Sequence, residues 1–255
     1  MQKKTLISLE ITLGSYREFC EKIVEMAKQN VSEYVCVANV HMLVEAHKDS
    51  EFANIVNSAS LVTPDGLPLT WGLKWLYKIK QERVAGMDLM PDLLNEASIH
   101  NLPVFIYGGT EEMLVKAQKY IQEKFQTIPS VSTYSPPFRK LTDEENEWVI
   151  KHINDSGAKI VFVVLGCPKQ ERWMASMHGK INAVMIGIGA ALPVLVGEQK
   201  RAPRWMQKSG LEWLFRFCQE PKRLWKRYLV TNTKFIVLLI KAKFKTMRKS
   251  KKNKK

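Results

Sequence analysis

Short apolar runs alternate with longer helical patterns through the first 200 residues, and this alternation limits the folds that the chain can adopt. Several runs, such as 159–165 (KIVFVVL), lack a strict polar–apolar alternation, as is typical of strands covered by helices on both faces. The pattern predicts an α/β domain with a mostly parallel sheet and crossover helices over residues 1–200. The predicted strands are 34–38, 61–63, 104–107, 131–134, 159–165 and 183–188, and the predicted helices are 16–30, 42–58, 111–125, 142–155 and 169–178.

The charge of the chain changes abruptly near residue 200. Residues 1–200 hold 21 Lys and Arg against 23 Asp and Glu, whereas residues 201–255 hold 18 against two, a net charge of +16. Trp, Phe and Leu side chains are interleaved with these cations, and Pro221 is expected to start a helix. Such a basic, amphipathic helical appendage is expected to meet a polyanion, either nucleic acid or the anionic face of a membrane.

The appendage is not expected to cross a bilayer. Its longest apolar run, 235–240, has six residues, whereas a spanning helix needs roughly 20. It could instead lie on the membrane surface, with apolar side chains in the interface and Lys and Arg at the headgroups. A basic helical hairpin packed on the body is the alternative, and on either interpretation the lysine-rich residues 247–255 are expected to be disordered.

The cysteines and the first residues bear on the compartment. Cys20, Cys36, Cys167 and Cys218 are scattered and form no C-x-x-C pair, which argues against a disulfide framework or a zinc site. The N-terminal segment has no apolar stretch of the kind that a secretory leader carries. A cytoplasmic location is therefore predicted.

Polar residues and glycines gather where five of the predicted strands end. In open α/β sheets, ligands bind beyond the carboxyl ends of the strands, so these residues are expected to surround one site. They are Asn39 and His41, Asp65, Gly108 and Gly109, residues 166–171 (GCPKQE), and residues 187–191 (GIGAA).

Each of these strand ends also has a purely structural interpretation. Asp65 and Gly66 form a common turn pair, and Asn39 could simply cap the next helix. Gly108 and Gly109 could form a tight strand-to-helix turn. Pro168 and Glu171 suit the first turn of a helix.

Missing motifs narrow the possible chemistry. The chain has neither G-x-x-x-x-G-K-[ST] nor G-x-S-x-G, and Gly187-x-Gly189 lacks the third glycine of a dinucleotide fingerprint. It also lacks Asp-x-Asp, with which sugar-nucleotide enzymes usually hold a divalent cation. Any diphosphate would then be neutralised by Arg, Lys and helix N-termini.

Taken together, the motifs resemble the WecG/TagA/CpsF family of bacterial glycosyltransferases (glycosyltransferase family 26). The resemblance is carried by ANVHMLVEAHKD (38–49), LVTPDGLPLTW (61–71), RVAGMDL (83–89), VFIYGGTEE (104–112), VVLGCPKQERWM (163–174), IGIGAA (186–191) and RAPRWMQKSGLEWLFRFCQEPKRLWKRYL (201–229). It implies a Rossmann-like α/β fold of the GT-E type, completed by a C-terminal appendage that holds the enzyme at the inner face of the membrane.

The resemblance also implies an activity. Family members are metal-independent, inverting enzymes without a cofactor. They move a sugar, in several members N-acetylmannosamine, from a UDP-sugar onto an undecaprenyl-diphosphate-linked sugar of the N-acetylglucosamine type. The products feed the synthesis of teichoic acid, enterobacterial common antigen, capsule or exopolysaccharide.

Roles for individual residues follow from the same resemblance. Asp65 of the P-D-G motif would be the catalytic base, with Asn39, Arg83 and Gln170 in the active site. Arg216 and Arg223 would contact the diphosphate, and a third basic position falls on either Lys226 or Arg227. Further substrate-binding residues are expected at Gly108, Gly109, Gly166, Glu171, Gly187, Gly189, Arg201 and Arg204.

Two departures from the family pattern concern the donor sugar. Many relatives continue I-G-I-G-A-A with an aromatic and an acidic residue, whereas this chain has Leu192 and Pro193. Several relatives also carry a hydroxyl residue where this chain has Ala38. The identity of the donor sugar therefore stays open.

Two other classes of protein compete with the transferase. A nucleic-acid-binding protein with residues 201–255 as a basic arm would use aromatic stacking, but it leaves the polar strand ends unexplained. An NAD(P)-dependent enzyme would need a complete glycine motif. A homo-oligomer is compatible with a membrane role, although no heptad is readable.

Overall fold

The computed structural model describes the backbone of residues 1–252, and the side chains in that range except those at 223, 226, 227 and 248–252. Its centre is a sheet whose strands are β3 (Glu33–Ala38), β4 (Leu61–Pro64), β5 (Val104–Gly108), β6 (Val131–Tyr134), β7 (Ile160–Val164) and β8 (Val184–Gly187). All six strands are parallel, in the order β4-β3-β8-β7-β5-β6. The six strands predicted from the sequence and the Rossmann-like α/β class are confirmed.

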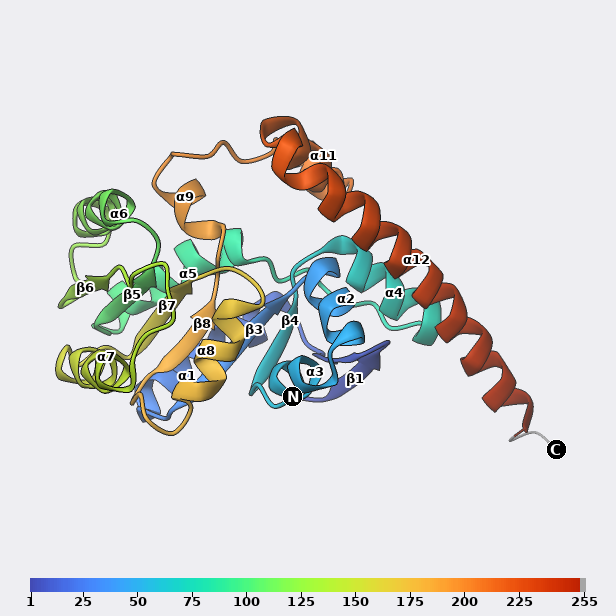
Figure 1. Cartoon of the computed structure of the whole chain (residues 1–255), viewed down its shortest axis with the longest axis horizontal. Coiled ribbons are helices and arrows are strands. Elements are labelled where there is room, and N and C mark those ends of the chain that lie inside the picture. The colour runs from blue at the N-terminus through green and yellow to red at the C-terminus, as the bar shows by residue number, and fades with distance from the viewer. Residues whose placement is uncertain (253–255) are drawn as a thin grey trace.

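Helices cover both faces of the sheet, with α6 and α7 visibly on opposite sides in Figure 1. Strand side chains alternate between the two faces: Val35 and Val37 pack on one core, and Tyr34 and Cys36 on the other. The first core involves α1 (Tyr16–Gln29), α5 (Gly86–Ile99), α6 (Glu111–Lys124) and α9 (Ala191–Leu195). The second involves α2 (Val40–Lys48), α3 (Ser50–Asn57), α4 (Leu67–Tyr77), α7 (Asp143–Asp155) and α8 (Lys169–Met177).

The predicted single helix over 42–58 is wrong, because the chain forms α2 and α3 in its place. Asp49 has an extended backbone (φ −128°, ψ 105°), and its carboxylate accepts a hydrogen bond from the Phe52 N–H at 3.1 Å. Asp49 thus ends one helix and caps the next, which is a role that short acidic side chains favour. The helices that begin after Ser15 and Thr142 start with complete capping boxes.

One hairpin and three helices were not predicted. The first is an antiparallel hairpin of β1 (Lys3–Leu6) and β2 (Leu9–Thr12), whose turn contains Ile7 at φ +62° rather than the usual Gly or Asn. The three helices are α4, α5 and α9. Gly72 lies inside α4 and Pro91 lies inside α5, and such residues argue against a helix when only the sequence is considered.

The C-terminal segment is helical and packs on the body. It consists of α10 (Arg204–Lys208), α11 (Glu212–Gln219) and α12 (Pro221–Lys252), so Pro221 does start a helix. Helix α12 runs beside α2 and α4 and then extends past the body (Figure 1). Leu224 and Phe235 are buried, and the Lys243 ammonium donates to the carbonyl of Trp75 at 2.7 Å.

The lysine-rich end, where disorder was expected, is helical as far as Lys252, and residues 253–255 lie outside the described range. Among the helices that the structure describes, none has the length and apolar character needed to cross a membrane.

Candidate active site

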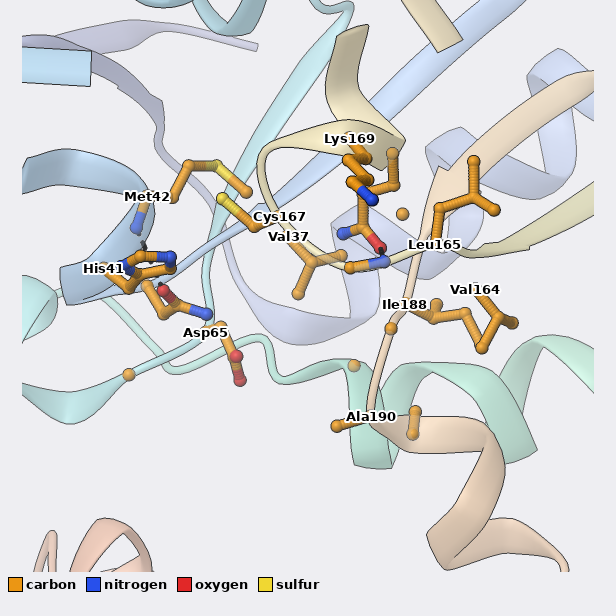
Figure 2. A pocket seen from close by; sticks show the side chains of 18 of the residues that line it. Val37, His41, Met42, Asp65, Val164, Leu165, Cys167, Lys169, Ile188 and Ala190 are labelled. Atoms are coloured by element: carbon orange, nitrogen blue, oxygen red, sulfur yellow. Dashed lines mark hydrogen bonds between the residues drawn. The ribbon is translucent and has the colours of Figure 1, made fainter. Parts of the chain in front are cut away.

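A large cavity opens at the carboxyl ends of the strands. Its volume is about 1650 Å³, and its walls come from the segments that follow each of the six strands of the central sheet, together with side chains of α11 and α12. In Figure 2 the Asp65 carboxylate lies between the side of the cavity that carries His41 and the segment that carries Ile188 and Ala190. The appendage is therefore part of the cavity wall.

Asp65 is held at the cavity by the backbone on both sides of it. Its N–H donates to the carbonyl of Ala38 at 2.8 Å, which continues the pairing of β4 with β3. The next residue, Gly66, is the N-cap of α4. The Asp65 carboxylate makes no hydrogen bond or ion pair with another residue whose side chain the structure describes. Asp65 is thus a turn residue whose carboxylate remains available to a ligand.

The environment of Asp65 raises its affinity for a proton. The pKa of its carboxyl is raised from 3.8 to about 6, chiefly because the surrounding protein removes part of its hydration and next because of the negative charge of Glu212. Arg83 and Arg216 act in the opposite direction. A carboxylate in this state is ionised at neutral pH and is a better proton acceptor than an exposed one, which suits a general base.

Arg83 is brought to the same place by a short extended segment beside β4. The Val84 N–H donates to the carbonyl of Pro64 at 2.9 Å, and the Thr63 hydroxyl donates to the carbonyl of Val84 at 3.2 Å. These bonds fix the backbone next to Arg83 at the carboxyl end of β4. The Arg83 guanidinium lines the cavity, and 17% of its side chain is exposed.

Asn39 caps a helix, which is the structural role that the sequence allows for it. It is the N-cap of α2, and its side-chain oxygen accepts a hydrogen bond from the Met42 N–H at 3.2 Å. Asn39 also lines the cavity. The cap occupies only the oxygen of the amide, so capping and a contact with substrate are compatible.

Gln170 contacts two of the glycines at the strand ends. Its Oε1 accepts from the Gly166 N–H at 3.1 Å, and its Nε2 donates to Glu171 Oε1 at 2.7 Å. A Cβ atom on Gly187 would lie only 2.8 Å from Gln170 Nε2, so a glycine is required there for Gln170 to approach the end of β8. The turn at Gly166 and the end of β8 at Gly187 thus both contact one buried amide.

The cavity brings together most of the residues singled out from the sequence, and leaves others outside. The residues that line it are Asn39, Asp65, Arg83, Gly109, Gly166, Gln170, Gly187, Gly189 and Arg216. Four expected residues do not line it: Gly108, Glu171, Arg201 and Arg204. The side chains of Arg223, Lys226 and Arg227 lie outside the described part of the structure.

The four residues outside the cavity have other surroundings. Gly108 (φ +99°) packs against the carbonyl of Val164, where a side chain would collide. Glu171 is fully buried behind Gln170, and burial raises the pKa of its carboxyl. Arg201 pairs with Asp88 beside a smaller pocket of about 250 Å³. Arg204 is exposed on α10.

Glu212 is a charged residue of the site that was not singled out from the sequence. Glu212, at the start of α11, accepts a hydrogen bond from Arg83 Nη1 at 2.5 Å and lines the cavity. A signal was present, because Glu212 is one of only two acidic residues in the strongly basic appendage.

The side chains that the structure describes offer no obvious metal site. Among them, no group of three or more His, Cys, Asp and Glu residues could hold a metal ion.

Comparison with known proteins places this site in a family. The profile of the glycosyl transferase WecG/TagA/CpsF family matches residues 4–249. An N-acetylglucosaminyldiphosphoundecaprenol N-acetyl-beta-D-mannosaminyltransferase of Bacillus subtilis (strain 168) is 28% identical over 233 residues, which cover 90% of this chain and 88% of the relative. A protein of the same name from Staphylococcus aureus (strain MW2) is 30% identical over 195 residues, which cover 75% of this chain and 74% of that relative. The chain belongs to the WecG/TagA/CpsF family of glycosyl transferases.

Proposed function

We propose that this protein is an inverting glycosyltransferase that moves a sugar from a UDP-sugar onto undecaprenyl-diphosphate-linked N-acetylglucosamine, with Asp65 as the general base. The observation that carries the proposal is the Asp65 carboxylate, which faces a cavity of about 1650 Å³ beside the guanidiniums of Arg83 and Arg216. Two relatives bear names that specify transfer to the same kind of lipid-linked acceptor.

In the proposed reaction Asp65 removes the proton of the acceptor hydroxyl. The hydroxyl oxygen forms a bond to the anomeric carbon of the donor while the bond from that carbon to the UDP oxygen breaks. One base on the face opposite the leaving group is sufficient, because no covalent intermediate forms. General base catalysis of this kind contributes roughly 10²- to 10⁴-fold.

UDP leaves as an anion and has to be stabilised by positive charge. Arg216 and Lys169 line the cavity and are candidates for this role. Arg172 also reaches the wall, but its guanidinium is already bound to Asp49 and Glu51. We propose that side-chain cations replace a divalent metal ion in this enzyme.

The acceptor is a membrane lipid, and α12 has the properties of a helix that lies on a membrane surface. Its large apolar side chains include several that are exposed to solvent, and Lys234, Lys241, Lys243 and Lys245 are distributed among them. The exposed apolar side chains are Trp225, Leu229, Val230, Ile236, Val237, Ile240, Phe244 and Met247. We propose that this surface holds the enzyme at the anionic inner face of the bacterial membrane.

Binding to the membrane is expected to favour the reaction. Asp65 comes from the body, whereas Arg216 comes from the appendage, so catalysis needs the two parts to be docked. Anionic vesicles should therefore increase the rate with a soluble acceptor analogue, and equal rates with and without vesicles would contradict this coupling.

The donor proposed is UDP-N-acetylmannosamine, on the basis of the relatives' names. The segment that departs from the family pattern lies close to the site, since Pro193 lines the cavity and Leu192 is fully buried beneath it. This position could alter the choice of donor, so the donor has to be tested directly.

The test is acceptor-dependent release of UDP by the purified protein in the presence of EDTA. UDP-N-acetylmannosamine, UDP-N-acetylglucosamine, UDP-glucose and UDP-galactose are offered separately with a lipid-diphosphate-linked N-acetylglucosamine. Turnover of UDP-N-acetylmannosamine that is lost in Asp65→Asn supports the proposal. Near-normal turnover in Asp65→Asn would refute the role of the base, and a requirement for added metal would refute metal independence.

A further inference from the structure

A network of four charged side chains joins the appendage to the body beside the cavity. Arg83 Nη1 donates to Glu212 Oε2 at 2.5 Å, and Arg83 Nη2 donates to Asp88 Oδ2 at 2.9 Å. Arg201 Nη2 then donates to the other oxygen of Asp88. Arg83 and Asp88 belong to the body, whereas Arg201 and Glu212 belong to the appendage. The pairs Arg83–Glu212 and Arg201–Asp88 therefore join the appendage to the body.

Within this network, the pair between Glu212 and Arg83 lies closest to the reacting groups. The side chains of Glu212 and Arg83 are only 19% and 17% exposed, and both residues line the cavity. An ion pair with so little exposure is screened less by solvent than a surface pair. Removing one partner would leave the other charge partly buried and without that partner, which is strongly unfavourable.

Glu212 also determines what else α11 presents to the cavity. Arg216 follows Glu212 by four positions, so both side chains lie on the same face of the helix. Helix α11 has no side-chain cap at its start. When Glu212 is bound to Arg83, the shared face of α11 is directed at the end of β4, and Arg216 lies near enough to Asp65 to act on its charge.

We propose that Glu212 is a positioning residue of the transfer reaction, which docks α11 on the body through Arg83 and thereby places Arg216 beside Asp65. The inference rests on the proposed function for its catalytic consequence, but the docking itself does not. A simpler role for Glu212 is an acidic residue in the first turn of a helix, where it complements the helix dipole. That role does not require Arg83, which lies 129 positions away in the sequence.

The charge of Glu212 should also be visible in the ionisation of Asp65. The charged groups that act on Asp65 are Glu212 and Asp88, which raise its pKa, and Arg83 and Arg216, which lower it. Of these charges, that of Glu212 has the largest effect on the pKa of Asp65. Replacing Glu212 by a neutral residue should therefore lower the pKa of Asp65, so the base would stay ionised at a lower pH than in the wild type.

The experiment compares Glu212→Gln with Glu198→Gln in the full-length protein. Glu198 is an acidic residue at the neighbouring small pocket, and it pairs with Lys116 rather than with a group of the site. Two quantities are measured: hydrogen exchange of the backbone amides in α11, without substrates, and kcat/KM as a function of pH.

In Glu212→Gln we expect the α11 amides to exchange faster and kcat/KM to fall roughly 10- to 100-fold. The acid limb of its pH profile should shift to a lower pH than the wild-type limb, which lies near pH 6. Glu198→Gln should match the wild type in all three. Glu212→Asp keeps the charge and shortens the side chain. Its α11 amides should exchange faster than in the wild type, and the acid limb of its pH profile should stay close to that of the wild type. This variant replaces Glu212→Gln in the test if Glu212→Gln does not fold.

If the α11 amides of Glu212→Gln exchange at the wild-type rate, the docking role is wrong. If the acid limb of its pH profile is not shifted, the effect of Glu212 on the pKa of Asp65 is wrong. If the wild type turns over none of the donors, the proposed function fails. The exchange measurement then still decides whether Glu212 docks α11.

Discussion

The carboxylate proposed as the catalytic base should lower the stability of the folded protein at neutral pH. The pKa of Asp65 is raised from 3.8 to about 6 in the folded state, so the folded protein binds the proton more tightly than the unfolded chain does. By linkage, this tighter binding of the proton stabilises the folded protein below pH 4, and the stabilisation is lost as the pH rises through 6. Asp65→Asn removes the charge and should stabilise the protein above pH 6.

The size of the effect follows from the shift. A shift of about two pKa units, at about 1.4 kcal/mol per unit, gives an upper limit of about 3 kcal/mol. The carboxylate reaches the water of the cavity, so we expect about 1–2 kcal/mol, or a rise in Tm of about 2–8 °C at pH 7.5. The gain should shrink to about a third at pH 4.5, where the wild-type carboxyl is mostly protonated in the folded state.

The assay is thermal and urea unfolding of Asp65→Asn and the wild type at pH 7.5 and 4.5. Asp155→Asn is the matched control, because Asp155 is an exposed residue in a surface pair with Lys151 and should change stability by less than about 0.5 kcal/mol. A variant less stable than the wild type at pH 7.5, or a gain that does not depend on pH, would refute the reasoning.

Three further predictions follow from the site and the appendage. For the wild type, kcat/KM should fall about tenfold between pH 7 and pH 5, because Asp65 with a pKa of about 6 must be ionised to accept a proton; a flat profile over this range would contradict its role. Gly187→Ala should lower activity at least tenfold and stability by about 1–3 kcal/mol, because the new Cβ would lie 2.8 Å from Gln170 Nε2. Gly179→Ala, where nothing lies within 4 Å but φ is +80°, should lower stability through backbone strain and leave activity unchanged in the same assays. Phe244→Glu, on the exposed surface of α12, should weaken sedimentation with anionic vesicles and leave turnover of a soluble acceptor analogue unchanged without vesicles.

The sheet could be predicted from the sequence because its strands are buried on both faces. Buried parallel strands are continuous apolar runs, and the runs at 104–107 and 159–165 contain almost no polar residue. The hairpin of β1 and β2 was missed because it is only partly buried and its turn lacks a Gly or Asn signal. The break between α2 and α3 depends on the conformation of Asp49, which its residue type favours but does not determine.

The site could be located from the sequence, but its internal contacts could not. Strand ends in a parallel sheet lie on one edge, so Asn39, Asp65 and Gln170 were expected near one another. Whether Gln170 or Glu171 faces the cavity depends on a rotation of about 100° in the first turn of α8, which adjacency in the sequence does not specify. Pairing of Arg83 with Glu212 depends on how the appendage docks, which no local pattern encodes. Membership of the family favours the transferase over the nucleic-acid-binding alternative.

The outer edge of β4 has a consequence for how copies of this protein can associate. An edge strand normally offers unpaired N–H and C=O groups to a strand of another molecule. In β4 the Val62 N–H donates to the Thr12 hydroxyl at 3.0 Å, and the carbonyl of Pro64 accepts from Val84. The hairpin and the segment at Val84 thus cover this edge. A second copy cannot extend the sheet here without displacing them, so the strand that leads to Asp65 is protected from intermolecular pairing.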